Sequence, residues 1–282
     1  MKFAICNELF CDEAAVGGPP WDWRRQCEYA AGVGYGGLEV APFTLGDAPL
    51  SVPADARAEM RRVAADAGVE VVGLHWLLAK TEGYHLTTAD AAVRTATADY
   101  LRGLADLCAD LGGSVMVLGS PQQRNREEGV SEDAAYEHAA KVLRAAASTL
   151  ESRGVTLCVE PLSPAETDFM QTCAGGRRLI DMVGSPSVRL HQDVKAMLSE
   201  EAPIPDLIRQ YADVTRHFHA NDGNLRGPGM GPTDFGPIMA ALREAGYGGW
   251  VSVEVFDYAP GAEATAVESL ACLRAAASDN VA

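Results

Sequence analysis

Short apolar runs and longer amphipathic segments alternate along the whole chain. The short runs are rich in β-branched residues and read as buried strands. In the longer segments apolar residues recur every three or four positions, as on one face of a helix. The predicted strands cover residues 2–7, 36–43, 69–76, 114–120, 155–160, 187–193, 214–221 and 249–256. The predicted helices cover residues 21–34, 54–68, 88–112, 131–153, 172–184, 203–212, 234–246 and 261–276, with Thr88 and Ser131 as N-caps.

This alternation continues without a break in composition, a linker or a low-complexity segment. Strands that are buried on both faces and separated by helices are typical of parallel sheets. The repeat predicts an α/β protein, a (β/α)8 TIM barrel, as a single domain over residues 1–282. A doubly wound open sheet is the alternative, and the lack of a GxGxxG turn after the first strand disfavours it.

Four consecutive predicted strands carry an acid or a histidine at or near their C-terminal ends: Glu160, Asp193, His219 and Glu254. Adjacent strands lie about 4.8 Å apart, and active sites of such barrels lie at this end of the strands. We therefore expect the four groups to converge on one divalent cation. Three carboxylates and one imidazole favour Mn²⁺ or Mg²⁺, with Co²⁺ also suited, over a thiolate zinc site. Any one of these residues alone is more typical of a cap or an ion pair.

The charge balance argues against nucleic acid as a partner. The chain has 23 Lys plus Arg against 39 Asp plus Glu, and its formal net charge is -16. A nucleic-acid-binding protein normally presents a basic stripe. The seven cysteines are scattered without a CxxC pair, as buried thiols are in reducing compartments. Because the N-terminus resembles no signal peptide and no run approaches 18 apolar residues, we expect a cytoplasmic protein that does not enter a membrane.

Further polar residues lie near the predicted strand ends. His75 and Trp76 follow the third strand, where a ring and a hydrogen-bonding group suit the wall of a small-molecule pocket; a packed core histidine is the alternative. His191 and His217 lie one layer deeper, as packing groups or supports for the ligands. Candidate pocket or supporting residues with weaker signals are Asn7, Glu8, Glu39, Asn221 and Asp222.

The strand-end motifs resemble those of the xylose isomerase-like TIM barrel superfamily. They are VEP at the fifth strand, LHQDVKAM at the sixth, HFHAND followed by GPGMG at the seventh, and WVSVEVF at the eighth. Within it, the chain is most similar to sugar isomerases and epimerases that include ketose 3-epimerases, over essentially its whole length. The resemblance implies that Glu160, Asp193, His219 and Glu254 bind the metal. It also implies that Glu160 and Glu254 are the acid/base pair on opposite faces of the sugar.

The same resemblance suggests substrate contacts and shows two departures. Glu166 matches a substrate-binding glutamate of the ketose 3-epimerases. Where their pattern has a histidine, this chain has Ala196, with Lys195 beside it as a replacement candidate. Where their pattern has an arginine, this chain has Leu225, with Arg226 next to it. Both departures leave the substrate open, while the metal motifs stay intact.

The expected function is a metal-dependent sugar isomerase or epimerase. It would act on a small keto sugar or polyol-derived ketone by proton transfer through a metal-stabilised enediolate. A lyase of the inosose dehydratase kind, or one that eliminates a group from a keto-glycoside, shares the early chemistry and stays open. An apurinic endonuclease or a silent sugar-binding protein is disfavoured by Ala196, the acidic charge and the paired glutamates. The expected partner is a small sugar, with a homodimer or homotetramer as the assembly to test.

Overall fold

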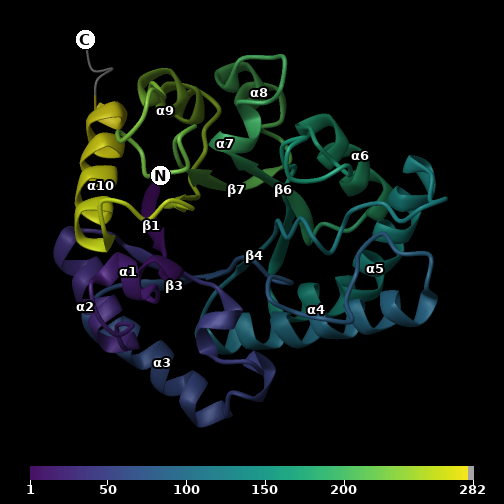
Figure 1. Ribbon diagram of the computed structural model, residues 1–282, viewed down its shortest axis with the longest axis horizontal. Helices are drawn as coiled ribbons and strands as arrows, with labels where there is room; N and C mark the ends of the chain where they lie inside the picture. The colour runs from purple at the N-terminus through teal and green to yellow at the C-terminus, as the bar shows by residue number, and fades with distance from the viewer. Residues whose placement is uncertain (279–282) are drawn as a thin grey trace.

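The computed structural model describes residues 1–278, and within this span eight parallel strands close into a barrel in chain order (Figure 1). Pairing of the first strand with the last completes the ring. The strands are β1 Lys2–Cys6, β2 Gly37–Val40, β3 Glu70–Leu74, β4 Val115–Leu118, β5 Thr156–Val159, β6 Val188–Asp193, β7 Thr215–Ala220 and β8 Trp250–Val253. The predicted TIM barrel is confirmed. The single domain over 1–282 stays a prediction, and its last four residues lie outside the described part.

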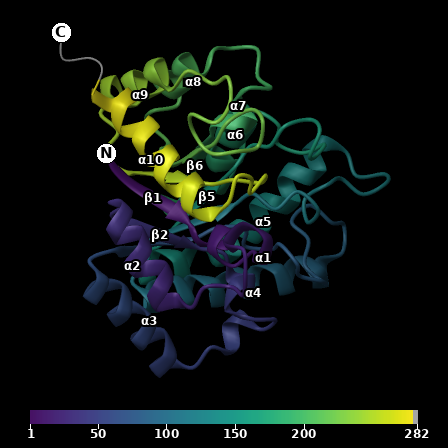
Figure 2. The ribbon, with the colours of Figure 1, turned by 60° about the vertical axis from the view of Figure 1, so that its left-hand side comes forward.

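Helices surround the strands and cover the outer face of the barrel (Figure 1). The main ones are α2 Trp23–Val33, α3 Ala54–Ala67, α4 Ala91–Leu111, α5 Glu132–Arg153, α6 Cys173–Val183, α8 Ile204–Gln210, α9 Phe235–Glu244 and α10 Ala262–Ser278. Short helices α1 (Glu13–Val16) and α7 (Val194–Met197) lie in the loops after β1 and β6. The last helix packs against α2, and β1 pairs with β8, so the first and last units of the barrel lie side by side (Figure 2).

Helix starts follow the expected capping chemistry with one correction. The Ser131 side chain accepts a hydrogen bond from Ala134 N and caps α5, as predicted. The prediction that Thr88 caps α4 is wrong. Asp90 is the N-cap, because its carboxylate accepts from the main-chain nitrogens of Ala92 and Val93. The Thr88 hydroxyl instead accepts from the Asp90 nitrogen, and Thr88 lies two residues before this N-cap.

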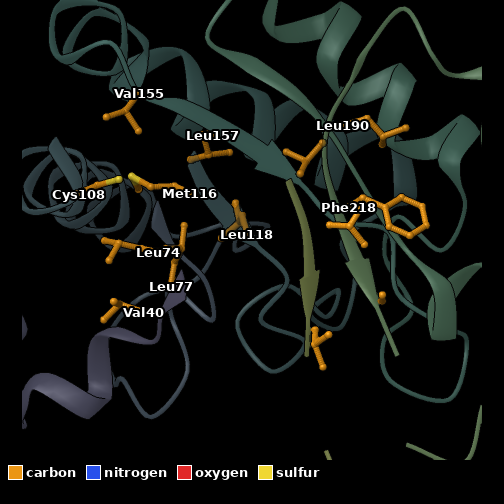
Figure 3. Close-up of a cluster of buried hydrophobic side chains, with 14 of the residues drawn as sticks. Val40, Leu74, Leu77, Cys108, Met116, Leu118, Val155, Leu157, Leu190 and Phe218 are labelled. Atoms are coloured by element: carbon orange, nitrogen blue, oxygen red, sulfur yellow. The ribbon is translucent and has the colours of Figure 1, made fainter. Parts of the chain in front are cut away.

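The main hydrophobic core lies between the strands and the surrounding helices. Outward-facing strand residues such as Met116, Leu157 and Phe218 pack there, and Cys108 of α4 lies beside Met116 (Figure 3). The inner face near the strand ends is instead polar and buried, which leaves that end of the barrel for chemistry. Among residues 1–278, no helix combines the length and the apolar character that a membrane crossing requires.

Candidate active site and metal centre

The four predicted metal ligands converge at the C-terminal ends of β5 to β8. Strand register sets Asp193 opposite His219, and His219 opposite Ser252, two residues before Glu254. One ligand atom each from Glu160, Asp193 and His219 lies within 4.8 Å of the others, together with one from His191. Glu254 Oε2 lies 3.1 Å from His219 Nδ1. The structure therefore brings together the residues that the sequence singled out.

The contact between Glu254 and His219 has the geometry of two ligands of one ion. Neither Glu254 Oε2 nor His219 Nδ1 has a hydrogen-bond partner among the described residues, although both are buried. Two ligand atoms about 2.1 Å from one ion and at right angles to each other lie about 3.0 Å apart. Oxygen donors with one imidazole suit a hard divalent cation. The buried cluster thus fits a divalent metal ion on the atoms that the structure leaves unpaired.

Asp193 is held by its neighbours on both oxygens. Oδ1 accepts from the main-chain nitrogen of Ala196, because Asp193 is the N-cap of α7. Oδ2 accepts from Asn221 Nδ2 at 2.6 Å. Asn221 in turn accepts from the main-chain nitrogen of Lys195 at 2.8 Å. Asn221 therefore orients Asp193, a predicted ligand.

A second buried layer supports His219. Its Nε2 lies 3.2 Å from Glu39 Oε1, and Glu39 Oε2 lies 2.8 Å from His217 Nε2. Burial opposes ionisation of Glu39, but the two histidines outweigh burial and hold its pKa well below the usual value. A carboxylate on the far nitrogen fixes the tautomer of a ligating histidine. Strand register pairs His191 with His217, each two residues before a candidate ligand, so both histidines belong to the deeper layer, as predicted.

Glu254 is held from the end of β3. Trp76 Nε1 donates to Glu254 Oε1 at 2.6 Å, and His75 Nδ1 lies 3.1 Å from the same oxygen. Trp76 has a φ of 52°, in the left-handed region that a bulky residue seldom adopts. Burial opposes ionisation of Glu254, but His219 and His75 outweigh it and keep its pKa well below the usual value.

Glu160 has different surroundings. Its pKa is raised well above the usual value by burial and by the charges of Glu254 and Asp193. A Cβ at Gly119 would lie 1.6 Å from Glu160 Oε2, so only glycine leaves room for this carboxylate. The buried Arg124 guanidinium donates to the main-chain oxygens of Glu160 and Leu118, both at 2.6 Å. Arg124 and Gly119 were missed by the sequence reasoning, which treated this segment as a strand end and a polar loop.

A cavity of about 350 Å³ opens onto Glu160 and Glu254. Trp76 and Phe256 form an aromatic wall, with ring centroids 5.9 Å apart and planes 20° from parallel. Lys195 Nζ lies 2.5 Å from Glu166 Oε1 and 4.1 Å from the centre of the Phe256 ring. The cavity thus combines an apolar face with a charged pair, as sugar-sized ligands require. Its further lining residues are Ala79, Lys80, Gly119, Ser120, Pro121, Gln122, Gln123 and Leu162.

The predicted substrate contacts separate into two groups. Trp76, Glu166 and Lys195 line the cavity. His75 is fully buried and contacts Glu8 and Glu254, and it is absent from the lining. Arg226 is also absent from the lining, and its Nε lies 2.8 Å from Asp257 Oδ2. Contacts of His75 and Arg226 with substrate stay predictions. The missed lining residues after β4 lie just past a strand end, a position that could have flagged them.

Comparison with known proteins agrees with this geometry. A family model described as "Xylose isomerase-like TIM barrel" matches residues 27–276. The chain is 28% identical over 237 residues to the D-psicose 3-epimerase of Agrobacterium fabrum, covering 81% of this chain and 78% of that enzyme. It is 30% identical over 172 residues to the L-ribulose 3-epimerase of Mesorhizobium japonicum, covering 61% of this chain and 58% of that enzyme.

Among solved structures, one of a D-psicose 3-epimerase in the presence of D-fructose matches with a TM-score of 0.85 at 23% identity. The match covers 98% of this chain and 99% of that chain, and at this identity it shows the shared fold. The chain belongs to the xylose isomerase-like TIM barrel family. Its similarity to named 3-epimerases confirms the expected class, an enzyme of the isomerase type that is similar to ketose 3-epimerases.

Proposed function

We propose that this protein is a divalent-metal-dependent epimerase or isomerase of a small keto sugar or a polyol-derived ketone. The observation that carries the proposal is the pair Glu160 and Glu254, which face one cavity from strand ends that also present Asp193 and His219. The curated relatives named above support a ketose 3-epimerase-like reaction. Mn²⁺ is the proposed ion, ahead of Mg²⁺ and Co²⁺, because three carboxylates suit a hard cation and the imidazole of His219 adds a nitrogen donor.

The two glutamates act as the acid/base pair in this proposal. When bound, the metal supplies an electrophile that makes a C–H bond beside the substrate carbonyl acidic. One glutamate takes that proton, and the glutamate on the opposite face of the sugar returns one, which inverts the configuration of the carbon. Glu254 is fixed by Trp76 and His75, whereas the Glu160 carboxylate has no hydrogen bond within the described residues. Glu254 therefore has the more rigid geometry and Glu160 the freer one.

The cavity walls bind and orient the sugar. Trp76 presents an apolar ring face, while Glu166 accepts from and Lys195 donates to sugar hydroxyls. The Lys195 ammonium also offsets the carboxylates that crowd this end of the barrel, because it lies close to Asp193, Glu166 and Glu160. The proposal leaves the individual sugar and its phosphorylation open. Assembly as a homodimer or homotetramer and a cytoplasmic location stay predictions, and light scattering of the purified chain checks the first.

Proton exchange in D₂O tests the function directly. The enzyme with Mn²⁺ is incubated with a panel of ketoses, inososes and 3-keto sugars, and the products are followed by NMR. We expect deuterium at one carbon together with inverted configuration. Glu160→Gln and Glu254→Gln should each lower the exchange rate by at least about 100-fold, the scale of acid/base catalysis.

Two results would contradict the proposal. Loss of water or of a substituent would assign the chain to the lyases, which none of the relatives named above supports. A protein that binds Mn²⁺ but exchanges no proton on any panel member would leave the metal site without the proposed reaction. Glu137→Gln on the outer helix α5 is the matched control, because Glu137 is exposed and should leave the rate unchanged.

A further inference from the structure

Carboxylates and imidazoles alternate in one continuous buried chain across the barrel interior. Successive contacts measure 2.9, 3.1, 3.1, 3.2 and 2.8 Å. Each member is at most 2% exposed. Each inner histidine uses both ring nitrogens and each inner glutamate both oxygens, one toward each neighbour. In order, the chain runs Glu8, His75, Glu254, His219, Glu39 and His217.

The Glu8 end of this chain lies outside the lining of the cavity. Neither Glu8 nor His75 lines the cavity. Glu8 Oε2 lies 2.9 Å from His75 Nε2 as an ion-pair contact. Neither Glu8 oxygen has a hydrogen-bond partner among the described residues. Burial of a carboxylate is unfavourable unless a partner offsets the lost hydration. Glu8 and His75 are buried together, and the second ring nitrogen of His75 faces Glu254. This arrangement points to a role that acts through Glu254.

We propose that Glu8 and His75 are positioning residues for Glu254. Glu8 fixes the His75 ring through Nε2, so that Nδ1 presents an N–H group to Glu254 Oε1. Trp76 Nε1 donates to the same oxygen. With Oε1 held by two donors, Oε2 is left to face His219 Nδ1 and the expected ion. The catalytic consequence rests on the proposed function, whereas the effect on metal binding does not.

The two amides closest to histidine in shape separate positioning from simple packing. An asparagine amide nitrogen reaches about where Nδ1 lies, and a glutamine amide nitrogen about where Nε2 lies. His75→Asn therefore keeps the donor to Glu254, while His75→Gln loses it but fills more of the space. If His75 only fills space, glutamine should be the better substitute. If it positions Glu254, asparagine should be better.

Mn²⁺ affinity of the metal-depleted full-length protein, measured by titration calorimetry, is the first readout. We expect His75→Gln to weaken binding by about 10- to 100-fold, the usual effect of removing a partner of a metal ligand, and His75→Asn to weaken it clearly less. Glu8→Met should weaken binding in the same direction, although Glu8 contacts His75 and not the ligands. His138→Gln on α5 is the matched control, since its ring contacts the Thr87 carbonyl, away from the site.

Thermal unfolding of each metal-depleted variant shows whether it is folded. Mn²⁺ affinities are compared among the folded variants. Equal Mn²⁺ affinity in wild type, His75→Asn and His75→Gln would overturn the proposal, as would glutamine outperforming asparagine. Wild-type affinity in Glu8→Met would remove Glu8 from it. With an active substrate, kcat should fall more than KM rises. If wild type turns over no substrate, the proposed function fails, but the affinity ranking still decides the positioning role.

Discussion

Gly119 is the residue whose absence of a side chain matters most to the site. Its Cβ position lies 1.6 Å from Glu160 Oε2 and 2.7 Å from Glu160 Cδ, so an alanine would push the carboxylate aside. We expect Gly119→Ala to fold and to lower kcat/KM by about 100-fold, the cost of a displacement of about 1 Å at a catalytic group. Gly18→Ala is the control, because no atom lies within 4 Å of its Cβ position. Equal kinetics in the two variants would show that Glu160 adapts.

Arg124 is a structural cation inside the loop after β4. Burial lowers its pKa to about 10, and its guanidinium holds main-chain oxygens at the ends of β4 and β5. Arg124→Met removes the charged donor of both oxygens and leaves the Leu118 oxygen with the main-chain nitrogen of Glu160, at 3.3 Å, as its remaining donor. We expect a loss of about 3 kcal/mol in the free energy of unfolding. Urea unfolding measures this loss. Arg126→Met removes a partly exposed partner of Asp168 and should cost less than about 1 kcal/mol.

At the scale of the element, α4 shows how one cap decides a helix start. Asp90 accepts hydrogen bonds from two main-chain nitrogens of the first turn. Asp90→Ala should reduce the free energy of unfolding by about 1 kcal/mol. Asp90→Asn should stay close to the wild-type stability, because asparagine caps as well as aspartate. Chemical unfolding of both variants provides the measurement. A loss of the same size in both would assign the effect to charge rather than to capping.

Strands and their ends were predictable because the signal for each is local. Glu160, Asp193, His219 and Glu254 each end a β-branched run, and parallel neighbours bring such ends together whatever the remaining details. The supporting residues carry no such signal. His75 and Glu254 are 179 positions apart, and their contact depends on closure of the barrel. Arg124 stands in a stretch as polar as any exposed loop, so only the packed structure shows that its guanidinium is buried.

At the scale of the whole molecule, metal and protons compete for one site. Above pH 6.5, the pH dependence of stability comes from the groups whose pKa values are raised. His191 and His217 do not contribute there, because their pKa values are lowered. Burial, with Glu254 and Asp193, raises the pKa of Glu160 well above its usual 4.5. Burial opposes protonation of His219, but nearby carboxylates outweigh it and raise its pKa. Stability from such groups is lost as pH rises through the raised values.

We therefore expect the Tm of the metal-free protein to fall between about pH 7 and about pH 8. Mn²⁺ binds the deprotonated ligands, so the rise in Tm that it causes should grow over the same range. Scanning calorimetry with and without Mn²⁺ at the two pH values measures both effects. A metal-induced rise in Tm that shrinks toward pH 8 would contradict the expected proton release.

The residues of this site come from two different halves of the chain. The four expected ligands come from β5 to β8, in the second half of the chain, whereas Glu8, Glu39, His75, Trp76 and Gly119 come from the first half. The expected ligands thus come from one half of the chain, and much of their support comes from the other. Substitutions in the first half can alter reactivity while the ligand set stays unchanged. Natural and directed evolution can therefore vary the two independently. Gene halves exchanged between relatives would show how far that independence extends.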